Sequence, residues 1–352
     1  MDVPSSIAVA LSGGVDSAMA AALLKAAGWE VYGLHFLLPA ADVVTEERVD
    51  RVRMIVKHLG IPLEIIDLRE MFERLVVEPF VDDYQQGLTP NPCVSCNPLI
   101  KFARLHRYIL EKKIPYLATG HYVRLGKEKD EGRVGLLRGR DLEKDQSYFL
   151  HRLGRAVLSR TVFPLGEMTK EEARLGARDM GLPCHSNPES QEICFITGMD
   201  YRRFIENRMG FRVEERGAII NEDGEILGEH QGVYRYTIGQ RHGLGIASSR
   251  PYYVKELRPD VNQVVVARRE ALFTKIVNAR DFNWIQGSPP ESAVKMEAQV
   301  RYRHKAASGR LEILSENEVR FIFDTPQWAV TPGQALACYA GERLIGGGWI
   351  RR

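Results

Sequence analysis

Along the first 120 residues, short apolar runs alternate with longer stretches in which apolar residues recur at helical spacing. Apolar runs of this length predict buried strands, and the 3.6-residue periodicity between them predicts helices. We expect strands over 7–11, 30–38, 63–67 and 116–119, and helices over 16–27, 46–59, 68–77 and 99–112. This alternation predicts an α/β fold in which helices cover both faces of a parallel sheet.

The pattern changes in the second part of the chain. Residues 122–144 predict an exposed hairpin, and helices are expected over 146–153 and 170–180, the second after a Thr169 N-cap. Strand-like composition then recurs between frequent turns, over 264–267, 295–302, 311–313, 319–323 and 335–339. Short strands separated by turns rich in Pro and Gly predict a small mixed or β domain and then a C-terminal β-barrel.

We therefore expect three domains, over 1–205, 206–272 and 273–352, since 352 residues is long for a single core. No run approaches ~18 consecutive apolar residues, so no membrane span or membrane partner is expected. Residues 1–11 are typical of a first strand rather than of a secretory signal. Five cysteines cannot all pair within one chain and suit a reducing compartment, so we expect the protein to be cytoplasmic.

The formal net charge of +2 is unevenly distributed. Residues 1–200 hold 25 Lys and Arg against 28 Asp and Glu, whereas residues 201–352 hold 23 against 18. A modest basic excess in the C-terminal part fits contact with a polyanion but does not require one.

A glycine-rich turn, Ser12-Gly13-Gly14-Val15-Asp16-Ser17, joins the first predicted strand to the first predicted helix. Backbone N–H groups at such a helix N-terminus form an anion site, and glycine lets the backbone approach a phosphate closely. The two serines can add hydroxyl donors, and Asp16 can help hold a magnesium ion. The turn lacks the lysine of the GxxxxGK[ST] loop. It resembles instead the loop of enzymes that cleave ATP to AMP and pyrophosphate.

Two segments contain cysteines in polar surroundings, over 89–97 and 191–195. Two prolines stiffen the first segment, which we expect to be a loop, with Cys96 just before the helix that follows. For Cys184 and Cys338 we favour the role of small buried hydrophobic residues. Cys93 and Cys96 could begin a zinc site completed by His121, Cys184 or Cys194, although no second Cys-x-x-Cys pair exists. The remaining alternative is sulfur chemistry through Cys96 and Cys194, in which a thiolate is the working species.

Taken together, these segments resemble the tRNA-specific 2-thiouridylases, bacterial enzymes that place sulfur on C2 of the wobble uridine. The resemblance extends over the whole chain. It comprises 12–17, 89–97 with Lys101-Phe102, 118–122, 144–149, 191–195, 236–241, 243–245, 301–303 and 332–334.

The resemblance implies an N-terminal ATP-pyrophosphatase domain of the adenine nucleotide α-hydrolase type, which uses ATP and Mg²⁺. It implies that Cys96 is the nucleophile, that Cys194 carries a persulfide, and that the two form a transient disulfide. ATP would be bound by Ala10, Leu11, Ser12, Gly13, Gly14, Val15, Asp16, Ser17, Phe36 and Gly120. The target base would meet Asn91, Pro92 and Cys93, and tRNA would contact His121, Lys144, Asp145, Gln146, Arg301, Tyr302 and Gln334. Some members have Asp in place of Cys93, which leaves the role of that residue open.

The implied reaction begins with adenylation of the C2 oxygen of the base at position 34, which turns it into a good leaving group. Sulfur then arrives from the Cys194 persulfide, either by direct attack of its terminal sulfur or as hydrosulfide released by Cys96. The implied partners are tRNAs of the Lys, Glu and Gln types and a persulfide donor protein, a cysteine desulfurase or a relay. Two other functions remain open: a synthetase that activates a small molecule, like argininosuccinate or GMP synthetase, and a tRNA-binding module without activity.

Overall fold

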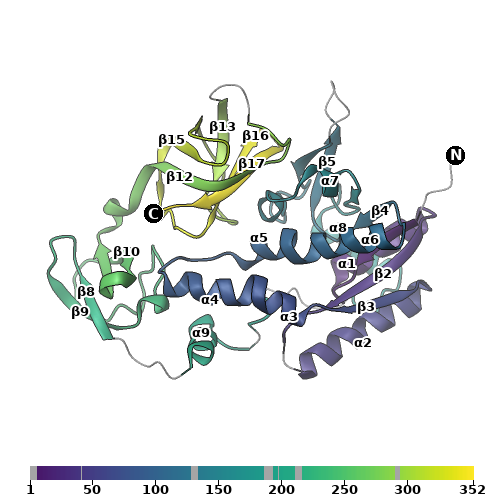
Figure 1. Cartoon of the computed structure of the whole chain (residues 1–352), viewed down its shortest axis with the longest axis horizontal. Helices are drawn as coiled ribbons and strands as arrows, with labels where there is room; N and C mark the ends of the chain where they lie inside the picture. The colour runs from purple at the N-terminus through teal and green to yellow at the C-terminus, as the bar shows by residue number, and fades with distance from the viewer. Residues whose placement is uncertain are drawn as a thin grey trace.

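The computed structural model describes residues 6–40, 42–127, 134–185, 193–196, 198–210, 216–289 and 294–352. An α/β unit, a small central β unit and a C-terminal barrel follow one another along the chain (Figure 1). In the described part of the chain, no helix is long and apolar enough to cross a membrane.

The N-terminal sheet is parallel throughout and has the strand order β3-β2-β1-β4-β7. Its strands are β1 (Ser6–Ala10), β2 (Glu30–Leu37), β3 (Leu63–Asp67), β4 (Tyr116–Ala118) and β7 (Thr161–Val162). The first four confirm the predicted strands to within one residue at each end, and the α/β class is confirmed. The chain runs outward from β1 to β3 and then returns to β4 on the other side of β1, so the strand order reverses between β1 and β4.

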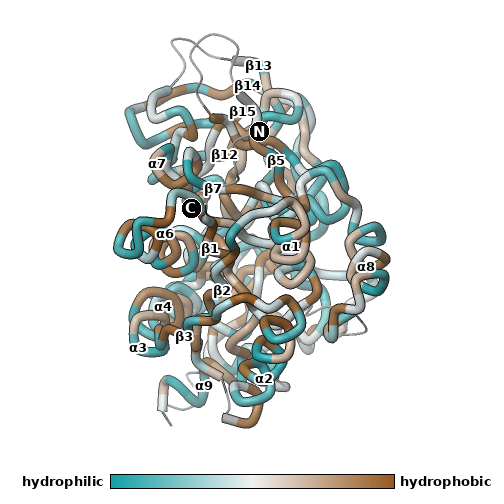
Figure 2. Tube along the Cα trace, turned by 90° about the vertical axis from the view of Figure 1, so that its right-hand side faces the viewer, coloured by the Kyte–Doolittle hydropathy of each residue, from teal (hydrophilic) through white to brown (hydrophobic). Residues whose placement is uncertain are grey.

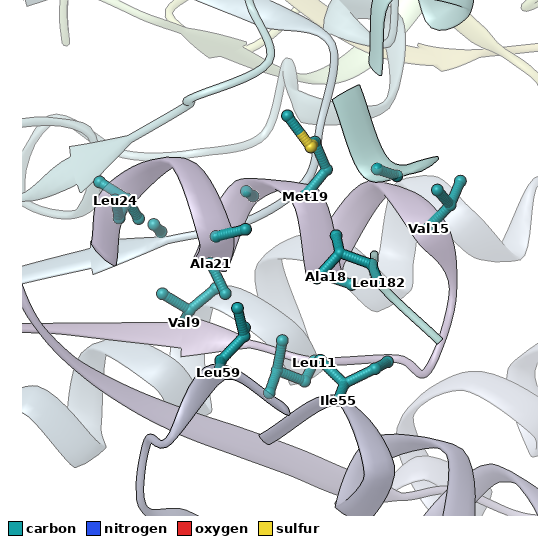
Figure 3. Close-up of a cluster of buried hydrophobic side chains, with 14 of the residues drawn as sticks. Val9, Leu11, Val15, Ala18, Met19, Ala21, Leu24, Ile55, Leu59 and Leu182 are labelled. Carbon is teal, nitrogen blue, oxygen red and sulfur yellow. The ribbon is translucent and has the colours of Figure 1, made fainter. Parts of the chain in front are cut away.

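Helix α1 (Val15–Ala26) packs against β1 through small side chains. Ala18, Ala20 and Ala21 are fully buried, as are Ile7 and Val9 of the strand. Alanine permits the helix axis to approach the sheet closely. Figure 3 shows Ala18 and Ala21 on the side of the helix that faces Val9 and Leu11. Helices α2 (Asp42–Leu59) and α8 (Lys170–Asp179) flank α1, and Figure 2 shows hydrophilic residues on both.

The helices between β3 and β4 are longer than expected. The first runs continuously through α3 (Arg69–Phe72), the π-helical η1 (Glu73–Val77) and α4 (Glu78–Gln85). The second comprises α5 (Pro92–Cys96), the π-helical η2 (Asn97–Phe102) and α6 (Ala103–Glu111). The expected loop over 89–97 is therefore wrong for its second half, because proline at N1 starts a helix readily. Cys96 lies inside this helix rather than before it.

The segment between β4 and α8 joins the α/β unit to the barrel. Strands β5 (Val123–Lys127) and β6 (Val134–Arg138) form the predicted hairpin, but β6 also pairs with β17 of the barrel, so the hairpin is partly buried. The helix expected over 146–153 is only the 3₁₀ turn η3 (Ser147–Leu150), followed by α7 (Arg155–Leu158). The predicted Thr169 N-cap of α8 is confirmed, since its side chain and that of Glu172 form a capping box.

The C-terminal unit is a closed antiparallel barrel of six strands in the order β12-β15-β14-β13-β16-β17, closed by pairing of β12 with β17. The strands are β12 (Phe273–Trp284), β13 (Val294–Gln299), β14 (Ala307–Ile313), β15 (Val319–Trp328), β16 (Ala335–Ala340) and β17 (Arg343–Ile350). The barrel confirms the prediction, although β12 and β17 were not foreseen. Gly346, Gly347 and Gly348 obscure β17 in the sequence, yet a Cβ on Gly346 would lie 2.3 Å from the Asn283 carbonyl of β12.

The central unit begins with α9 (Tyr201–Met209) and has a four-stranded sheet in the order β10-β11-β8-β9. Its strands are β8 (Arg216–Ile220), β9 (Ile226–Gln231), β10 (Tyr253–Arg258) and β11 (Gln263–Ala267), and its 3₁₀ turns are η4 (Val233–Arg235), η5 (Pro259–Val261) and η6 (Arg269–Leu272).

Buried side chains join the barrel to the α/β unit, among them Tyr148, whose hydroxyl donates to the Ala335 carbonyl at 3.1 Å.

Candidate active site

A pocket of about 520 Å³ opens where the strand order reverses between β1 and β4. In parallel α/β sheets this position, outside the carboxyl ends of the strands, is where ligands bind. The lining combines the glycine turn with residues from β2, α2, η2, the β4–β5 loop and the Cys194 segment. Its members are Ala10, Leu11, Ser12, Gly13, Gly14, Asp16, Ser17, His35, Phe36, Leu37, Leu38, Thr45, Arg48, Arg51, Lys101, Thr119, Gly120, His121, Gln146 and Cys194.

The glycine turn is held by its own serines. The Ser17 hydroxyl donates to the Gly14 carbonyl at 3.1 Å and accepts from the Ser12 backbone N–H at 3.1 Å. The Ser12 hydroxyl in turn accepts from the Gly14 N–H at 3.3 Å. These bonds fix the turn at the N-terminus of α1, where the helix dipole and free N–H groups favour an anion.

Two glycines make this shape possible. Gly13 has φ +82°, which side-chain-bearing residues rarely adopt. Gly120 lies directly behind the turn, and a Cβ there would stand 2.7 Å from the carbonyl carbon of Asp16 and 2.8 Å from the Ser17 nitrogen. The β4–β5 loop therefore supports the turn by close backbone contact.

The Asp16 carboxylate is bound by two side chains from elsewhere in the chain. Lys170 Nζ lies 2.6 and 2.7 Å from its two oxygens, and the Tyr122 hydroxyl donates to one of them at 2.7 Å. Among the residues that the structure describes, no group of three or more His, Cys, Asp or Glu side chains is placed to hold a metal ion. One carboxylate beside a phosphate site still fits the usual way in which Mg²⁺ is held, mainly by nucleotide phosphates and water.

The far wall of the pocket is formed by β2. His35 is buried, and its Nδ1 lies 2.8 Å from the Leu11 carbonyl, so it fixes the end of β1. Burial lowers the pKa of His35, so the imidazole is neutral near pH 7 and its Nδ1–H can donate. The half-buried ring of Phe36 lines the same wall, where an aromatic ring can pack against a flat purine.

Cys93, Cys96 and Cys194 lie close enough to interact electrostatically, and of these three Cys194 is the one that lines the pocket. Cys194 is exposed and lines the pocket, and its carbonyl accepts a hydrogen bond from Arg48 of α2 at 3.2 Å. Cys96, at the end of α5, is 5% exposed, whereas Cys93 on the same helix is exposed. The predictions of Cys184 and Cys338 as buried residues are confirmed, at 2% and 0% exposure.

The charges around these cysteines centre on Lys101. Burial raises the pKa of the Cys96 thiol to about 12, and the Lys101 ammonium acts in the opposite direction. For His121 burial acts on a group that is charged when protonated, so it lowers the pKa to about 3, and the positive charge of Lys101 adds to this effect. His121 is therefore neutral, and its Nδ1 forms a 2.8 Å hydrogen bond with the Thr119 hydroxyl.

The residues for which we predicted tRNA contacts lie in two connected groups. Gln146 lines the pocket, and its side-chain oxygen accepts from the Tyr122 N–H at 2.9 Å. The Asp145 carboxylate is buried and paired with Arg138 at 3.0 Å, and it also accepts from Gly139 and Ser147. The side chain of Asp145 thus organises the segment that presents Lys144 and Gln146, and its contact with tRNA stays a prediction.

The barrel contributes the second group. Tyr302 packs its ring against Phe149, with centroids 4.2 Å apart, and so adjoins the segment that contains Lys144. Arg301 is half-buried and donates to the carbonyls of Trp328 and Ala329, both at 3.4 Å. Gln334 donates to the Thr89 carbonyl at 2.8 Å, which places it beside the start of the Asn91–Cys93 segment.

Sequence reasoning assigned no role to several residues that shape the site. His35, Arg48, Lys101, Tyr122 and Lys170 come from five different elements, and none has a local sequence signal of its own. Lys101 and Tyr122 lie within segments that carry the resemblance, Lys101-Phe102 and 118–122, whereas His35, Arg48 and Lys170 lie outside all of them.

Three family models match consecutive parts of the chain. They are described as a tRNA methyl transferase HUP domain over residues 5–198, a tRNA methyl transferase PRC-barrel domain over 202–268 and an aminomethyltransferase beta-barrel domain over 274–350. Relatives matched over almost their whole length carry a different name, tRNA-specific 2-thiouridylase MnmA. One from Acidithiobacillus ferrooxidans is 44% identical over 97% of this chain and 97% of its own, and one from Carboxydothermus hydrogenoformans is 41% identical over 98% and 97%.

Solved structures show weaker similarity. A 4-thiouridine synthetase in complex with RNA and ATP is 16% identical, with a TM-score of 0.35, over 55% of this chain and 45% of its own. An NMN synthetase from Francisella tularensis is 14% identical, with a TM-score of 0.34, over 53% and 66%.

Proposed function

The chain belongs to the tRNA-specific 2-thiouridylase family, and we propose that it replaces the C2 oxygen of the wobble uridine of tRNA with sulfur, at the expense of ATP. The observation that carries the proposal is that one pocket is lined by both the glycine turn and Cys194. A site that holds a phosphate-binding turn beside reactive thiols suits activation by adenylation followed by sulfur transfer. The methyl transfer named in the family-model descriptions would use neither feature.

Activation takes place at the glycine turn. The N–H groups at the start of α1 and the Ser12 hydroxyl bind the pyrophosphate portion of ATP, in a turn that the Ser17 hydroxyl holds through the Gly14 carbonyl, and the adenine lies against Phe36. The uridine C2 oxygen attacks the α-phosphorus, and pyrophosphate departs into a site whose donors are already in place. A bound Mg²⁺, with Asp16 as the protein carboxylate nearest the turn, would neutralise charge on the phosphates.

Sulfur transfer takes place at the cysteines. The terminal sulfur of a persulfide on Cys194 attacks C2, and AMP leaves with the former uridine oxygen. The Cys96 thiolate then attacks Sγ of Cys194, which forms the Cys96–Cys194 disulfide and leaves the second sulfur on the base as 2-thiouridine. An external dithiol restores both thiols. In the other order, Cys96 first displaces hydrosulfide, which then attacks C2.

The exposure of the cysteines fits these roles. Cys194 is exposed and lines the pocket, so it can receive sulfur from a donor protein, whereas Cys96 is buried and shielded from such a partner. The target base must turn outward to reach the pocket, which costs a few kcal/mol and less for a base that is already unpaired. We propose that Asn91, Pro92 and Cys93 meet this base, because the same helix places them one turn before Cys96.

We propose that the tRNA lies along the surface between the barrel and the α/β unit. His121, Lys144 and Gln146 present polar groups near the pocket, and Arg301, Tyr302 and Gln334 come from the barrel side. Arg and Lys can bind phosphates, and a tyrosine ring can stack on an unpaired base. The tRNA types that carry the modifiable uridine and the identity of the persulfide donor remain proposals from the family.

The function is tested by incubating the protein with unmodified tRNA, ATP and a persulfide donor, and measuring nucleosides and nucleotides by mass spectrometry. We expect 2-thiouridine in the tRNA together with AMP and pyrophosphate, and nucleotide turnover that depends on tRNA. Release of ADP and phosphate would contradict the assignment of the turn. AMP formation that depends on a small amino acid or nucleotide, without tRNA, would favour a synthetase.

A further inference from the structure

Lys101 is a charged pocket residue to which the proposed reaction assigns no role. It belongs to η2, lines the pocket with Cys194 and His121, and is largely shielded from solvent. Arg48 and Arg51, the other cations of the lining, come from α2, and Arg48 donates to the backbone carbonyl of Cys194 at 3.2 Å. Among the cations of the described lining, only Lys101 lies on the helix that bears Cys96.

The π-helical turn determines where Lys101 points. In an α-helix, a residue five positions further on lies about 140° around the axis, close to the opposite side. The structure replaces the α-helix by π-helix from Asn97 to Phe102, directly after Cys96. A π turn joins residues five apart, so it returns Lys101 toward the side occupied by Cys96. Such inserted turns occur frequently at functional sites.

The surrounding groups give this placement an electrostatic meaning. Burial alone would lower the pKa of Lys101, but the sulfurs of Cys96, Cys93 and Cys194 reverse the effect and raise it. His121, which also faces Lys101, stays neutral and does not compete for the thiolates. The Lys101 ammonium therefore interacts electrostatically with all three sulfurs.

We propose that Lys101 is the counter-cation of the thiol centre and stabilises the Cys96 thiolate as it attacks Sγ of Cys194. This inference rests on the proposed function for the identity of the step. In that step the Cys96–Cys194 bond forms, the sulfur–sulfur bond at Cys194 breaks, and the electron pair departs on the sulfur bound to C2. Burial disfavours the thiolate of Cys96, and a nearby cation such as the Lys101 ammonium opposes that effect.

The test measures the thiolate of Cys96 without requiring the reaction. The full-length protein is treated with iodoacetamide at several pH values at which it stays folded, and alkylation of the Cys96 peptide is followed by mass spectrometry. Lys101→Met keeps the length of the side chain and removes the charge, and Lys101→Gln removes the charge but keeps a polar end. Lys101→Arg retains the charge. Lys112→Met is the matched control, since Lys112 is an exposed lysine at the end of the same helix.

We expect alkylation of Cys96 to slow about tenfold in both neutral variants, because a shift of one pKa unit changes the thiolate fraction tenfold. Lys101→Arg and Lys112→Met should remain within about threefold of the unaltered protein. Equal rates in the unaltered protein and in either neutral variant that folds would overturn the proposal, even if thiolation were lost. Slowed alkylation in a protein that makes no 2-thiouridine would support the role of Lys101 and refute the proposed function instead.

Discussion

Substitution of Gly120 by alanine tests the contact that supports the glycine turn. The added Cβ would lie 2.7 Å from the Asp16 carbonyl carbon, 2.8 Å from the Asp16 oxygen and 2.8 Å from the Ser17 nitrogen. All three are backbone atoms, so no side-chain rotation can relieve the contact. Either the turn or the β4–β5 loop must shift by several tenths of an ångström.

We expect the substitution to weaken the binding of ATP. Forced insertion of a methyl group into packed structure typically costs about 1–3 kcal/mol. A displaced turn also misplaces N–H donors to a charged phosphate, and each such bond contributes about 1.5–3 kcal/mol. Loss of one bond corresponds to about 10- to 150-fold weaker ATP binding, since each 1.4 kcal/mol is tenfold.

Isothermal titration calorimetry with ATP measures this effect, and circular dichroism establishes that the variant is folded. The control is Gly154→Ala, because a Cβ at Gly154 meets no atom within 4 Å and its φ of −86° suits alanine. A folded Gly120→Ala protein that binds ATP as tightly as the Gly154→Ala protein would refute the reasoning.

Three further predictions concern the RNA surface, the thiols and acid stability. Arg301→Ala should weaken tRNA binding and reduce the slope of log affinity against log salt concentration by about one, as measured by filter binding. Arg310→Ala, the control, should change neither quantity. An unchanged slope in Arg301→Ala would make Arg301 a structural residue. Mild oxidation without tRNA should form a disulfide between Cys93 and Cys96, which mass spectrometry detects as the loss of two hydrogen atoms from one peptide. Cys93→Ser should prevent the reversible loss of activity that accompanies this oxidation. If the oxidised Cys93→Ser protein is equally inactive, this side reaction is excluded. Burial lowers the pKa of His151 to about 4 in the folded protein. Between pH 6.5 and 4 the unfolded chain therefore binds a proton at this histidine that the folded protein does not bind. The stability that the neutral imidazole contributes above pH 6.5 is lost as the pH falls through this interval. Urea denaturation of His151→Asn should therefore lose less stability over that interval, and a parallel loss in both proteins would show that other groups are responsible.

The sequence predicts the parallel sheet well because each of its first four strands coincides with a short run of mainly apolar residues, and Ile7, Ala8 and Val9 at its centre are fully buried. The barrel is harder to predict, since β12 carries charged residues on its outer face and β17 contains three consecutive glycines. Those glycines are required by the neighbouring strand and by His151, whose ring would meet a Cβ on Gly347 at 2.5 Å. Such a requirement arises from residues distant in the sequence, so no local pattern reveals it.

In the candidate site, too, some features could be predicted from local sequence and others could not. The glycine turn could be predicted, because its function depends on consecutive residues. Lys170 could not, since it reaches Asp16 from a helix that begins 154 residues later. The prediction of a loop is wrong for residues 92–97, because Pro92 is the first residue of a helix rather than a stiffener of an extended segment.

The central claim is that one pocket activates the uridine and a cysteine pair then delivers sulfur to it. The most direct measurement follows unmodified tRNA with ATP and a persulfide donor in the unaltered protein and in Cys96→Ser and Cys194→Ser. Mass spectrometry of the digested tRNA and chromatography of the nucleotides report the two half-reactions separately. The account predicts that both variants lose 2-thiouridine while tRNA-dependent adenylation remains detectable. Thiolation that persists in either variant would contradict it.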